Sequence, residues 1–203
     1  DLKRQVLSDC MKYLSPNGIY AINTSSISIA DIAVKAKNPS QVVGMRYFSP
    51  ILKSALLEIV VTQKTAKWVI ATSIEVGIRQ GKVPIVVKDT PGFYTTRILG
   101  VLLNEALLLL EEGGDILQVD EAAKQLGFSK GVFELIDEIG IDVGGHIMSG
   151  ALLQFLRKRH IERRISMGLL ELYKAGYRGR KNLNGFYSYH SKTGKRRVGM
   201  VDE

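Results

Sequence analysis

The sequence predicts an α/β layer over residues 1–88, followed by an all-α domain over residues 89–203. Helix and strand signals alternate in the first part, which is typical of helices packed on a sheet. The breaker Thr90-Pro91-Gly92-Phe93 then leads into almost purely helical periodicity. The first part is too short for a complete nucleotide-binding fold, so the pattern indicates only the trailing half of such a domain.

Within residues 1–88, short apolar runs predict strands, and the run at residues 56–61 is also rich in β-branched residues. Apolar spacings of three and four predict helices. The turn cluster Ser15-Pro16-Asn17-Gly18 ends the first helix, and Gly81 ends the last one. Strands are expected at residues 19–22, 42–45, 56–61 and 83–87, and helices at residues 2–14, 28–36 and 65–80.

Beyond Asp89, a long apolar helix is expected at residues 94–112, because Gly113-Gly114 supplies its stop. Further helices are expected at residues 115–126, at 133–160 in one or two pieces, and at 166–175. Glycines between residues 140 and 150 blur the boundaries of the third helical stretch.

The net charge of +8 is unevenly distributed. Residues 1–150 carry 15 Lys/Arg against 16 Asp/Glu, whereas residues 151–203 carry 13 against 4. A solvated helix face with a mobile tail is the favoured interpretation. A polyanion-binding patch and the attraction of an anionic ligand stay open, but no aromatic stacking pattern accompanies the charge, so nucleic acid is not favoured as a partner.

Composition excludes several classes of protein. The single cysteine, Cys10, rules out a disulfide framework and is interpreted as an apolar filler. No apolar run reaches the length of a membrane helix. His146, His160 and His190 lack metal-ligand spacing, so no metal site is predicted. The chain opens inside a helical pattern without a leader, and we expect a cut within a domain.

Several sequence blocks, in one order and spacing, cover nearly the whole chain. They are Asn23-Thr24-Ser25, residues 44–50, Leu57-Glu58, residues 88–93, residues 133–137, Gly179-Arg180-Lys181 and Gly185-Phe186-Tyr187. Together they resemble the C-terminal portion of the 3-hydroxyacyl-CoA dehydrogenases. The motifs Tyr-Phe-Ser-Pro and Pro-Gly-Phe-Tyr-Thr-Thr-Arg most resemble the dehydrogenase region of the mitochondrial trifunctional protein α subunit.

The resemblance implies a Rossmann-type NAD-binding domain, here only its trailing part, and a helical C-terminal domain for dimerisation and substrate. It implies the NAD-dependent oxidation of an L-3-hydroxyacyl-CoA thioester to 3-ketoacyl-CoA in fatty-acid β-oxidation. It also implies a homodimer or a subunit of a β-oxidation complex. The expected location is the mitochondrial matrix side, with the peroxisome as an alternative.

In this family a histidine removes the hydroxyl proton, and a glutamate orients the imidazole. By resemblance, Arg46 stands at the histidine position and Glu58 at the glutamate position, twelve residues later. A guanidinium stays protonated and has no lone pair with which to accept a proton. An Arg46–Glu58 ion pair can therefore preserve the structure but not the general-base step.

Other family positions carry over residue by residue. Ser25 matches the serine near both substrate and nicotinamide, Asn23 precedes it in the same turn, and Lys3 and Lys181 match lysines that approach the cofactor. Ser49 and Thr96 stand where many relatives have an asparagine that contacts NAD and substrate, respectively. Read without the family, Ser25 is a helix N-cap or turn residue, Thr96 an ordinary first-turn residue, and the lysines are solvated.

Two hypotheses follow. One is a dehydrogenase-family protein that is inactive because Arg46 replaces the catalytic histidine and residues 1–88 contain no glycine-rich NAD turn. The other is a pseudoenzyme that serves as an interaction module and keeps the dimerisation domain.

Overall fold

The computed structural model describes residues 2–25, 27–48 and 50–190. The chain forms two compact units, residues 1–95 and residues 96–203. The sequence pattern predicted a domain boundary after residue 88, and the division between the two units lies seven residues later, after Thr95. Residues 89–95 belong to the first unit because Phe93 packs in its core.

The first unit is an α/β layer, as predicted. Its helices are α1 (Leu2–Cys10), α2 (Ile29–Ala33), the short 3₁₀ turn η1 (Pro39–Gln41) and α3 (Lys67–Arg79). Its strands are β1 (Tyr20–Ile22), β2 (Val42–Tyr47), β3 (Leu56–Val61) and β4 (Val83–Lys88). All the predicted strands form. The helices α1 and α2 are shorter than the predicted ranges 2–14 and 28–36, since turns follow Cys10 and Ala33.

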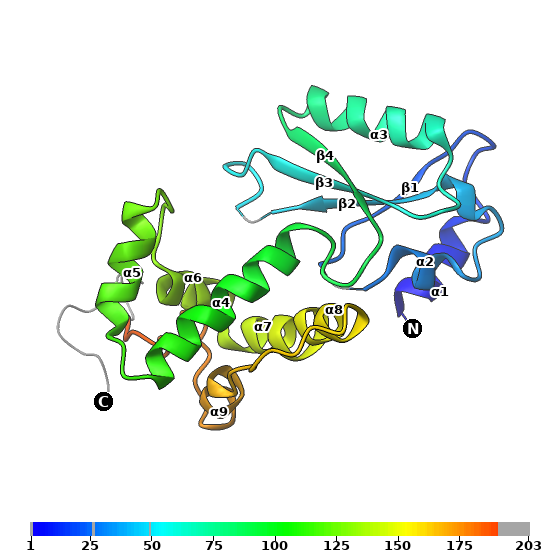
Figure 1. The fold of residues 1–203 in the computed structure, drawn as a ribbon. Helices are drawn as coiled ribbons and strands as arrows, with labels where there is room; N and C mark the ends of the chain where they lie inside the picture. The colour runs from blue at the N-terminus through cyan, green and yellow to red at the C-terminus, as the bar shows by residue number, and fades with distance from the viewer. Residues whose placement is uncertain (1, 26, 49, 191–203) are drawn as a thin grey trace. The chain divides into compact units, whose positions relative to one another are not determined.

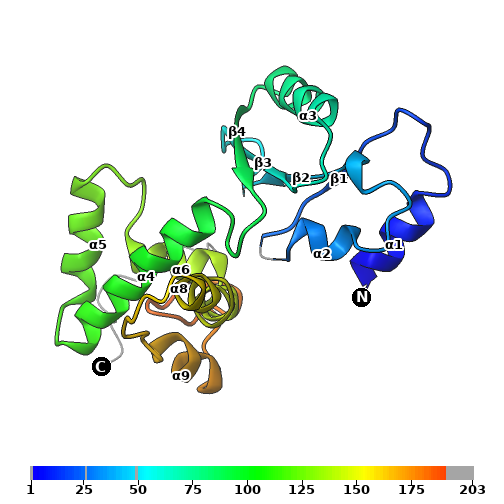
Figure 2. The ribbon, with the colours of Figure 1, turned by 45° about the vertical axis from the view of Figure 1, so that its right-hand side comes forward.

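The described strands form one sheet in the order β1-β2-β3-β4. The pairs β1–β2 and β3–β4 are parallel, and the central pair β2–β3 is antiparallel. Helix α3 covers one face of the sheet, and α1 and α2 cover the other (Figures 1 and 2). Since β1 and β2 run the same way, their carboxyl ends lie at one edge of the sheet, and β3 begins there.

Alternation along the strands divides the core into two layers. Val42 and Val60 pack towards α1 and α2, whereas Val43, Leu57 and Ile59 pack towards α3 in a separate cluster. Arg46 and Glu58 have the parity of Val42 and Val60. Arg46 and Glu58 therefore lie on the face of the sheet that α1 and α2 cover.

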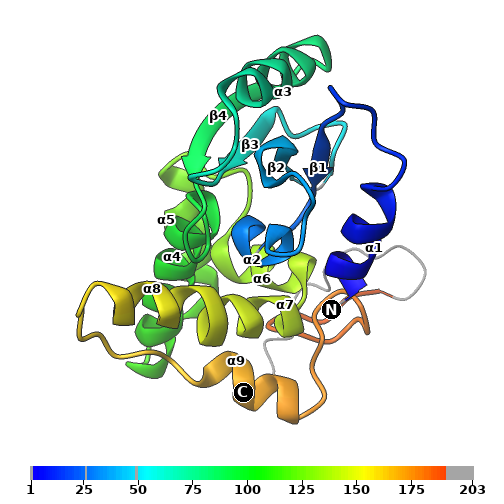
Figure 3. The ribbon, with the colours of Figure 1, turned by 90° about the vertical axis from the view of Figure 1, so that its right-hand side faces the viewer.

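The second unit is helical throughout the part of it that the structure describes. It contains α4 (Thr95–Glu111, whose first residue belongs to the first unit), α5 (Ile116–Gln125), α6 (Val132–Ile139), α7 (Ile141–His146), α8 (Leu153–Lys158) and α9 (Gly168–Lys174). A π-helical segment, η2 (Ile147–Leu152), joins α7 to α8. Figure 3 shows α7 and α8 following one another, with α9 alongside. The predicted stretch 133–160 is thus interrupted at Gly140 and again by the π segment.

A buried carboxylate, Asp120, connects several segments of this unit. Asp120 accepts hydrogen bonds from the backbone nitrogens of Phe133 and Glu134 and from the Tyr187 hydroxyl. Asp120 lies on α5, Phe133 and Glu134 lie on α6, and Tyr187 lies in the C-terminal segment. The carboxylate therefore joins three segments that are distant in sequence.

Among the described residues, no single helix has the length and apolarity to cross a membrane. Val132–Ile139 and Ile141–Lys158 reach those values only together, as a pair bent by 100°. Over residues 2–25, 27–48 and 50–190, no group of three or more His, Cys, Asp or Glu side chains could hold a metal ion.

Candidate functional site

The candidate site lies at the sheet edge where β1 and β2 end. Asn23 follows β1, and its side-chain oxygen accepts a hydrogen bond from the Tyr47 backbone nitrogen at 3.3 Å. Arg46 precedes Tyr47 in β2 and pairs with Glu58 across the ladder. The sheet register thus brings together three predicted site residues, Asn23, Arg46 and Glu58.

The Arg46 side chain is held from several directions. Its Nη1 donates to Glu58 Oε2 at 2.8 Å and to Thr95 Oγ1 at 2.9 Å. The guanidinium carbon lies 4.5 Å from the centre of the Phe48 ring, a cation–π contact. Only 11% of the Arg46 side chain is exposed. The guanidinium is therefore fixed in one orientation at the edge of the sheet.

Glu58 is fully buried and accepts hydrogen bonds at both oxygens. Oε1 accepts from the backbone nitrogens of Tyr94 and Thr95, at 3.1 and 2.8 Å, and Oε2 accepts from Arg46. A buried carboxylate needs such donors to offset its lost hydration. Glu58 consequently joins β3 to the segment that enters α4.

Two opposing effects act on the charge of the Arg46 guanidinium. Burial lowers the pKa of the Arg46 guanidinium, and the attraction of Glu58 and its hydrogen bond oppose that change. A guanidinium does not lose its proton in proteins. The site therefore presents a hydrogen-bond donor at the position where the resemblance leads us to expect an imidazole.

Ser25 lies exposed in the loop between β1 and α2. It is not the N-cap of α2, because Ser28 holds that position and its hydroxyl accepts from the Asp31 backbone nitrogen. Lys3 is exposed on α1. Ser49 lies outside the described residues. Ser25 and Lys3 are thus open to a ligand, and their contact with one stays a prediction.

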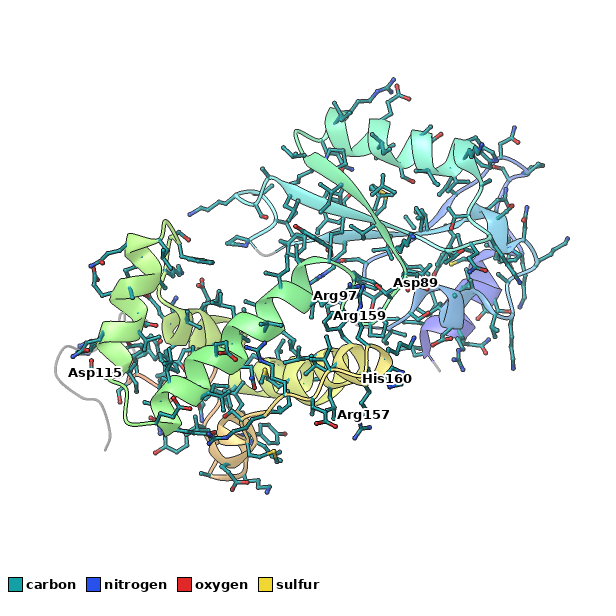
Figure 4. The ribbon with its side chains drawn as sticks, viewed as in Figure 1. Asp89, Arg97, Asp115, Arg157, Arg159 and His160 are labelled. Atoms are coloured by element: carbon teal, nitrogen blue, oxygen red, sulfur yellow. The ribbon has the colours of Figure 1, made fainter. Side chains whose placement is uncertain are left out.

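Asp89 secures the segment that leads to Thr95. Its carboxylate accepts from the Ser28 hydroxyl and the Ala30 nitrogen, both at 2.8 Å, and from the Ile29 nitrogen at 3.1 Å. Figure 4 labels Asp89 beyond the end of β4. Sequence reading placed it in a family block without giving it this capping role, which only the fold reveals.

Lys181 and Thr96 belong to the helical unit. The Lys181 ammonium donates to Asp142 Oδ1 at 2.6 Å, with both side chains partly exposed. Thr96 is 1% exposed, and its hydroxyl has no hydrogen-bond partner in the described part of the chain. The Asp142 side chain also lines a cavity of about 570 Å³ between α7, η2 and α9, which the sequence did not predict.

Part of the basic C-terminal region forms ion pairs within the helical unit. Arg163 pairs with Glu105, and Arg164 pairs with Glu111. Arg159, labelled in Figure 4 with Arg157 and His160 near the end of α8, lies 5.4 Å from the Phe155 ring centre. These contacts accord with the solvated-face interpretation, since exposed ion pairs of this kind are common on helix surfaces.

The first unit has an exposed polar residue at the edge of the sheet where α/β proteins bind ligands. Ligands of α/β sheets bind beyond the carboxyl ends of parallel strands, and the exposed Ser25 follows such an end. Residues 1–95 contain no G-x-G-x-x-G turn, the element that receives a pyrophosphate at a helix N-terminus.

Comparison with known proteins identifies the family. Residues 1–90 match the 3-hydroxyacyl-CoA dehydrogenase NAD binding domain, and residues 92–189 match the C-terminal domain of the same family. The fatty acid oxidation complex subunits alpha of Shewanella loihica and Shewanella amazonensis are each 41% identical over 100% of this chain. The chain spans 28% of the length of these relatives.

Solved structures agree with this assignment. The (S)-3-hydroxybutyryl-CoA dehydrogenase of Ralstonia eutropha superposes with a TM-score of 0.87 at 34% identity, covering 94% of this chain and 67% of that one. The 3-hydroxybutyryl-CoA dehydrogenase of Escherichia coli K12 gives 0.83 at 32% identity, covering 92% and 40%. The two family-model matches and the similar solved structures agree: the chain belongs to the 3-hydroxyacyl-CoA dehydrogenase family.

Proposed function

We propose that this chain is a fatty-acid-oxidation module that binds an acyl-CoA thioester but does not oxidise L-3-hydroxyacyl-CoA with NAD. The observation that carries the proposal is the buried Arg46–Glu58 ion pair at the sheet edge. Oxidation of an alcohol requires a group that removes the hydroxyl proton as hydride leaves for the nicotinamide. Arg46 cannot be that group because its guanidinium only donates.

Glu58 does not replace the missing base. Its oxygens already accept three hydrogen bonds, two from backbone nitrogens and one from Arg46, and the residue has no exposed surface. A base must come within hydrogen-bond reach of the proton that it removes. Loss of general-base catalysis costs roughly 10²–10⁴-fold in rate.

The test is NADH consumption with acetoacetyl-CoA, measured beside an active family member. The expected result for this chain is turnover more than tenfold below that of the relative. Turnover within tenfold would contradict the proposal. Circular dichroism and a thermal unfolding transition on the same sample establish that the inactive protein is folded.

The second candidate is a non-catalytic module that acts through its helical unit, as a homodimer or as a subunit of a β-oxidation complex. The match of residues 92–189 to the family's C-terminal domain supports it, as do the relatives named as complex subunits. Sedimentation equilibrium tests it, since a monomer at all concentrations would exclude the homodimer. The mitochondrial matrix, with the peroxisome as alternative, stays a prediction that cell fractionation tests.

A further inference from the structure

We infer that Arg46 makes the site selective for 3-ketoacyl thioesters, whose two carbonyl oxygens a guanidinium edge can bind together. The inference rests on the proposed function, because it concerns the ligand retained by a site that no longer turns it over. It assigns Arg46 a positive role in recognition, in addition to the loss of the histidine.

The first step concerns the donors that Arg46 has left. A guanidinium carries five N–H groups, and Nη1 uses its two on Glu58 and Thr95. The Nε and Nη2 atoms form no hydrogen bond to the described residues, and neither is a buried atom without a partner. The edge formed by Nε and Nη2 therefore meets solvent within the exposed 11% of the side chain.

The second step concerns orientation. The ion pair to Glu58, the hydrogen bond to Thr95 and the stacking on Phe48 fix the plane of the guanidinium. Ligand binding then needs little further ordering of a long side chain, an ordering that otherwise weakens affinity. A lysine at this position would be a point charge without a fixed plane.

The third step concerns the ligand. Two parallel N–H groups match two coplanar acceptor oxygens, as in bidentate binding of a carboxylate. The thioester carbonyl and the C3 ketone of a 3-ketoacyl-CoA can lie in one plane with both oxygens on the same side. A 3-hydroxyacyl-CoA has a tetrahedral C3 and loses the planar match, and a saturated acyl-CoA offers one oxygen only.

The neighbouring groups are compatible with this ligand. Asn23 and the exposed Ser25 are uncharged and follow β1 at the same edge of the sheet. Glu58 is saturated by its donors and compensates the charge of Arg46, so the pair is neutral overall. A neutral dicarbonyl or its enolate therefore meets donors rather than a competing carboxylate oxygen.

The test is isothermal titration calorimetry with acetoacetyl-CoA, 3-hydroxybutyryl-CoA and butyryl-CoA, without NAD. The three ligands share coenzyme A and the acyl carbon count, so they differ only at C3. Acetoacetyl-CoA is expected to bind about tenfold more tightly than either of the others, as two charge-assisted hydrogen bonds allow. Equal affinities, tighter binding of the hydroxy compound, or no binding of any of them would overturn the inference.

Arg46→Lys keeps a charge opposite Glu58 but removes the planar edge. The preference for acetoacetyl-CoA is expected to fall to within threefold, with butyryl-CoA affinity unchanged. Arg79→Lys, on an exposed arginine of α3 that pairs with Glu75, is the matched control and should keep the full preference. An unchanged preference in folded Arg46→Lys would also overturn the inference.

A parallel NADH assay distinguishes failure of the proposed function from failure of the proposed ligand preference. Turnover of acetoacetyl-CoA at the rate of a relative contradicts the proposed function, whatever the affinities. Absent turnover with equal affinities contradicts the ligand preference alone.

Discussion

Arg46 and Glu58 lie directly opposite each other in the β2–β3 ladder, and the arginine donates to the buried carboxylate at 2.8 Å. Removing one partner of such a pair leaves the other buried without compensation. We expect Glu58→Gln to lower the free energy of unfolding by about 3–5 kcal/mol, the usual cost of breaking a buried pair. Urea denaturation followed by circular dichroism measures it.

The double variant Arg46→Met/Glu58→Met is the control for this prediction. Replacing both charges with apolar side chains often restores the stability that a single replacement loses. The double variant should therefore be more stable than Glu58→Gln. If Glu58→Gln cost less than about 0.5 kcal/mol, the size of a surface substitution, the ion pair would not hold this edge of the sheet.

Thr95 offers a finer probe of the same cluster. Thr95→Val keeps the shape of the side chain and removes the hydroxyl that accepts from Arg46 Nη1. A hydrogen bond to a charged group contributes about 1.5–3 kcal/mol, so the free energy of unfolding should fall by an amount in that range. Thr72→Val, on the exposed face of α3, is the matched control and should change stability by less than about 0.5 kcal/mol. Equal effects of the two variants would show that the hydroxyl does not position Arg46.

Much of the first unit could be read from local pattern. Short apolar runs located each described strand of the sheet, because the strands bury side chains on both faces of the sheet. The pairing of Arg46 with Glu58 came from the spacing of a family motif, and the antiparallel register explains that spacing. Local pattern therefore located the elements, and the resemblance located the pair.

What local pattern could not reveal depends on contacts between distant segments. The hydroxyl of Thr95 reaches Arg46 across 49 positions of sequence, and Asp89 caps α2 across about 60. The π segment at residues 147–152 packs against α4, where a Cβ at Gly100 would lie 3.2 Å from the Cβ of Leu152. None of these has a signature in a short window of sequence.

Gly185 lies where a side chain would meet a buried carboxylate. A Cβ built at this position would stand 2.0 Å from Asp137 Oδ1, so Gly185→Ala should destabilise the protein by about 1–3 kcal/mol through overpacking. Gly145→Ala is the matched control, since a Cβ there meets nothing within 4 Å and the helix gains about 0.5–1 kcal/mol. Thermal unfolding of both variants checks whether the melting temperature falls for Gly185→Ala and rises for Gly145→Ala. A melting temperature of Gly185→Ala at or above that of the parent would contradict the close approach.

Asp137 gives the helical unit a dependence on pH. Its carboxylate accepts from the Phe186 and Tyr187 nitrogens at 2.9 Å and from the Tyr189 hydroxyl at 3.0 Å. Burial nevertheless raises the pKa of Asp137, against the effect of these donors. A carboxyl with a raised pKa in the folded protein favours folding most below its unfolded pKa, about 3.9, and that contribution is lost as pH rises through the folded pKa.

Asp137→Asn removes the titration while keeping the shape of the side chain. The variant should be less stable at every pH, because its amide nitrogen cannot accept the hydrogen bonds that an Asp137 oxygen accepts. Its deficit relative to the parent should be largest near the unfolded pKa and shrink as pH rises towards neutrality, since only the parent loses the linked contribution. Urea denaturation of both proteins across this range measures the difference, in which the other titrating groups cancel. A deficit that grows with pH would mean that the donors outweigh burial and that the pKa of Asp137 is lowered in the folded protein.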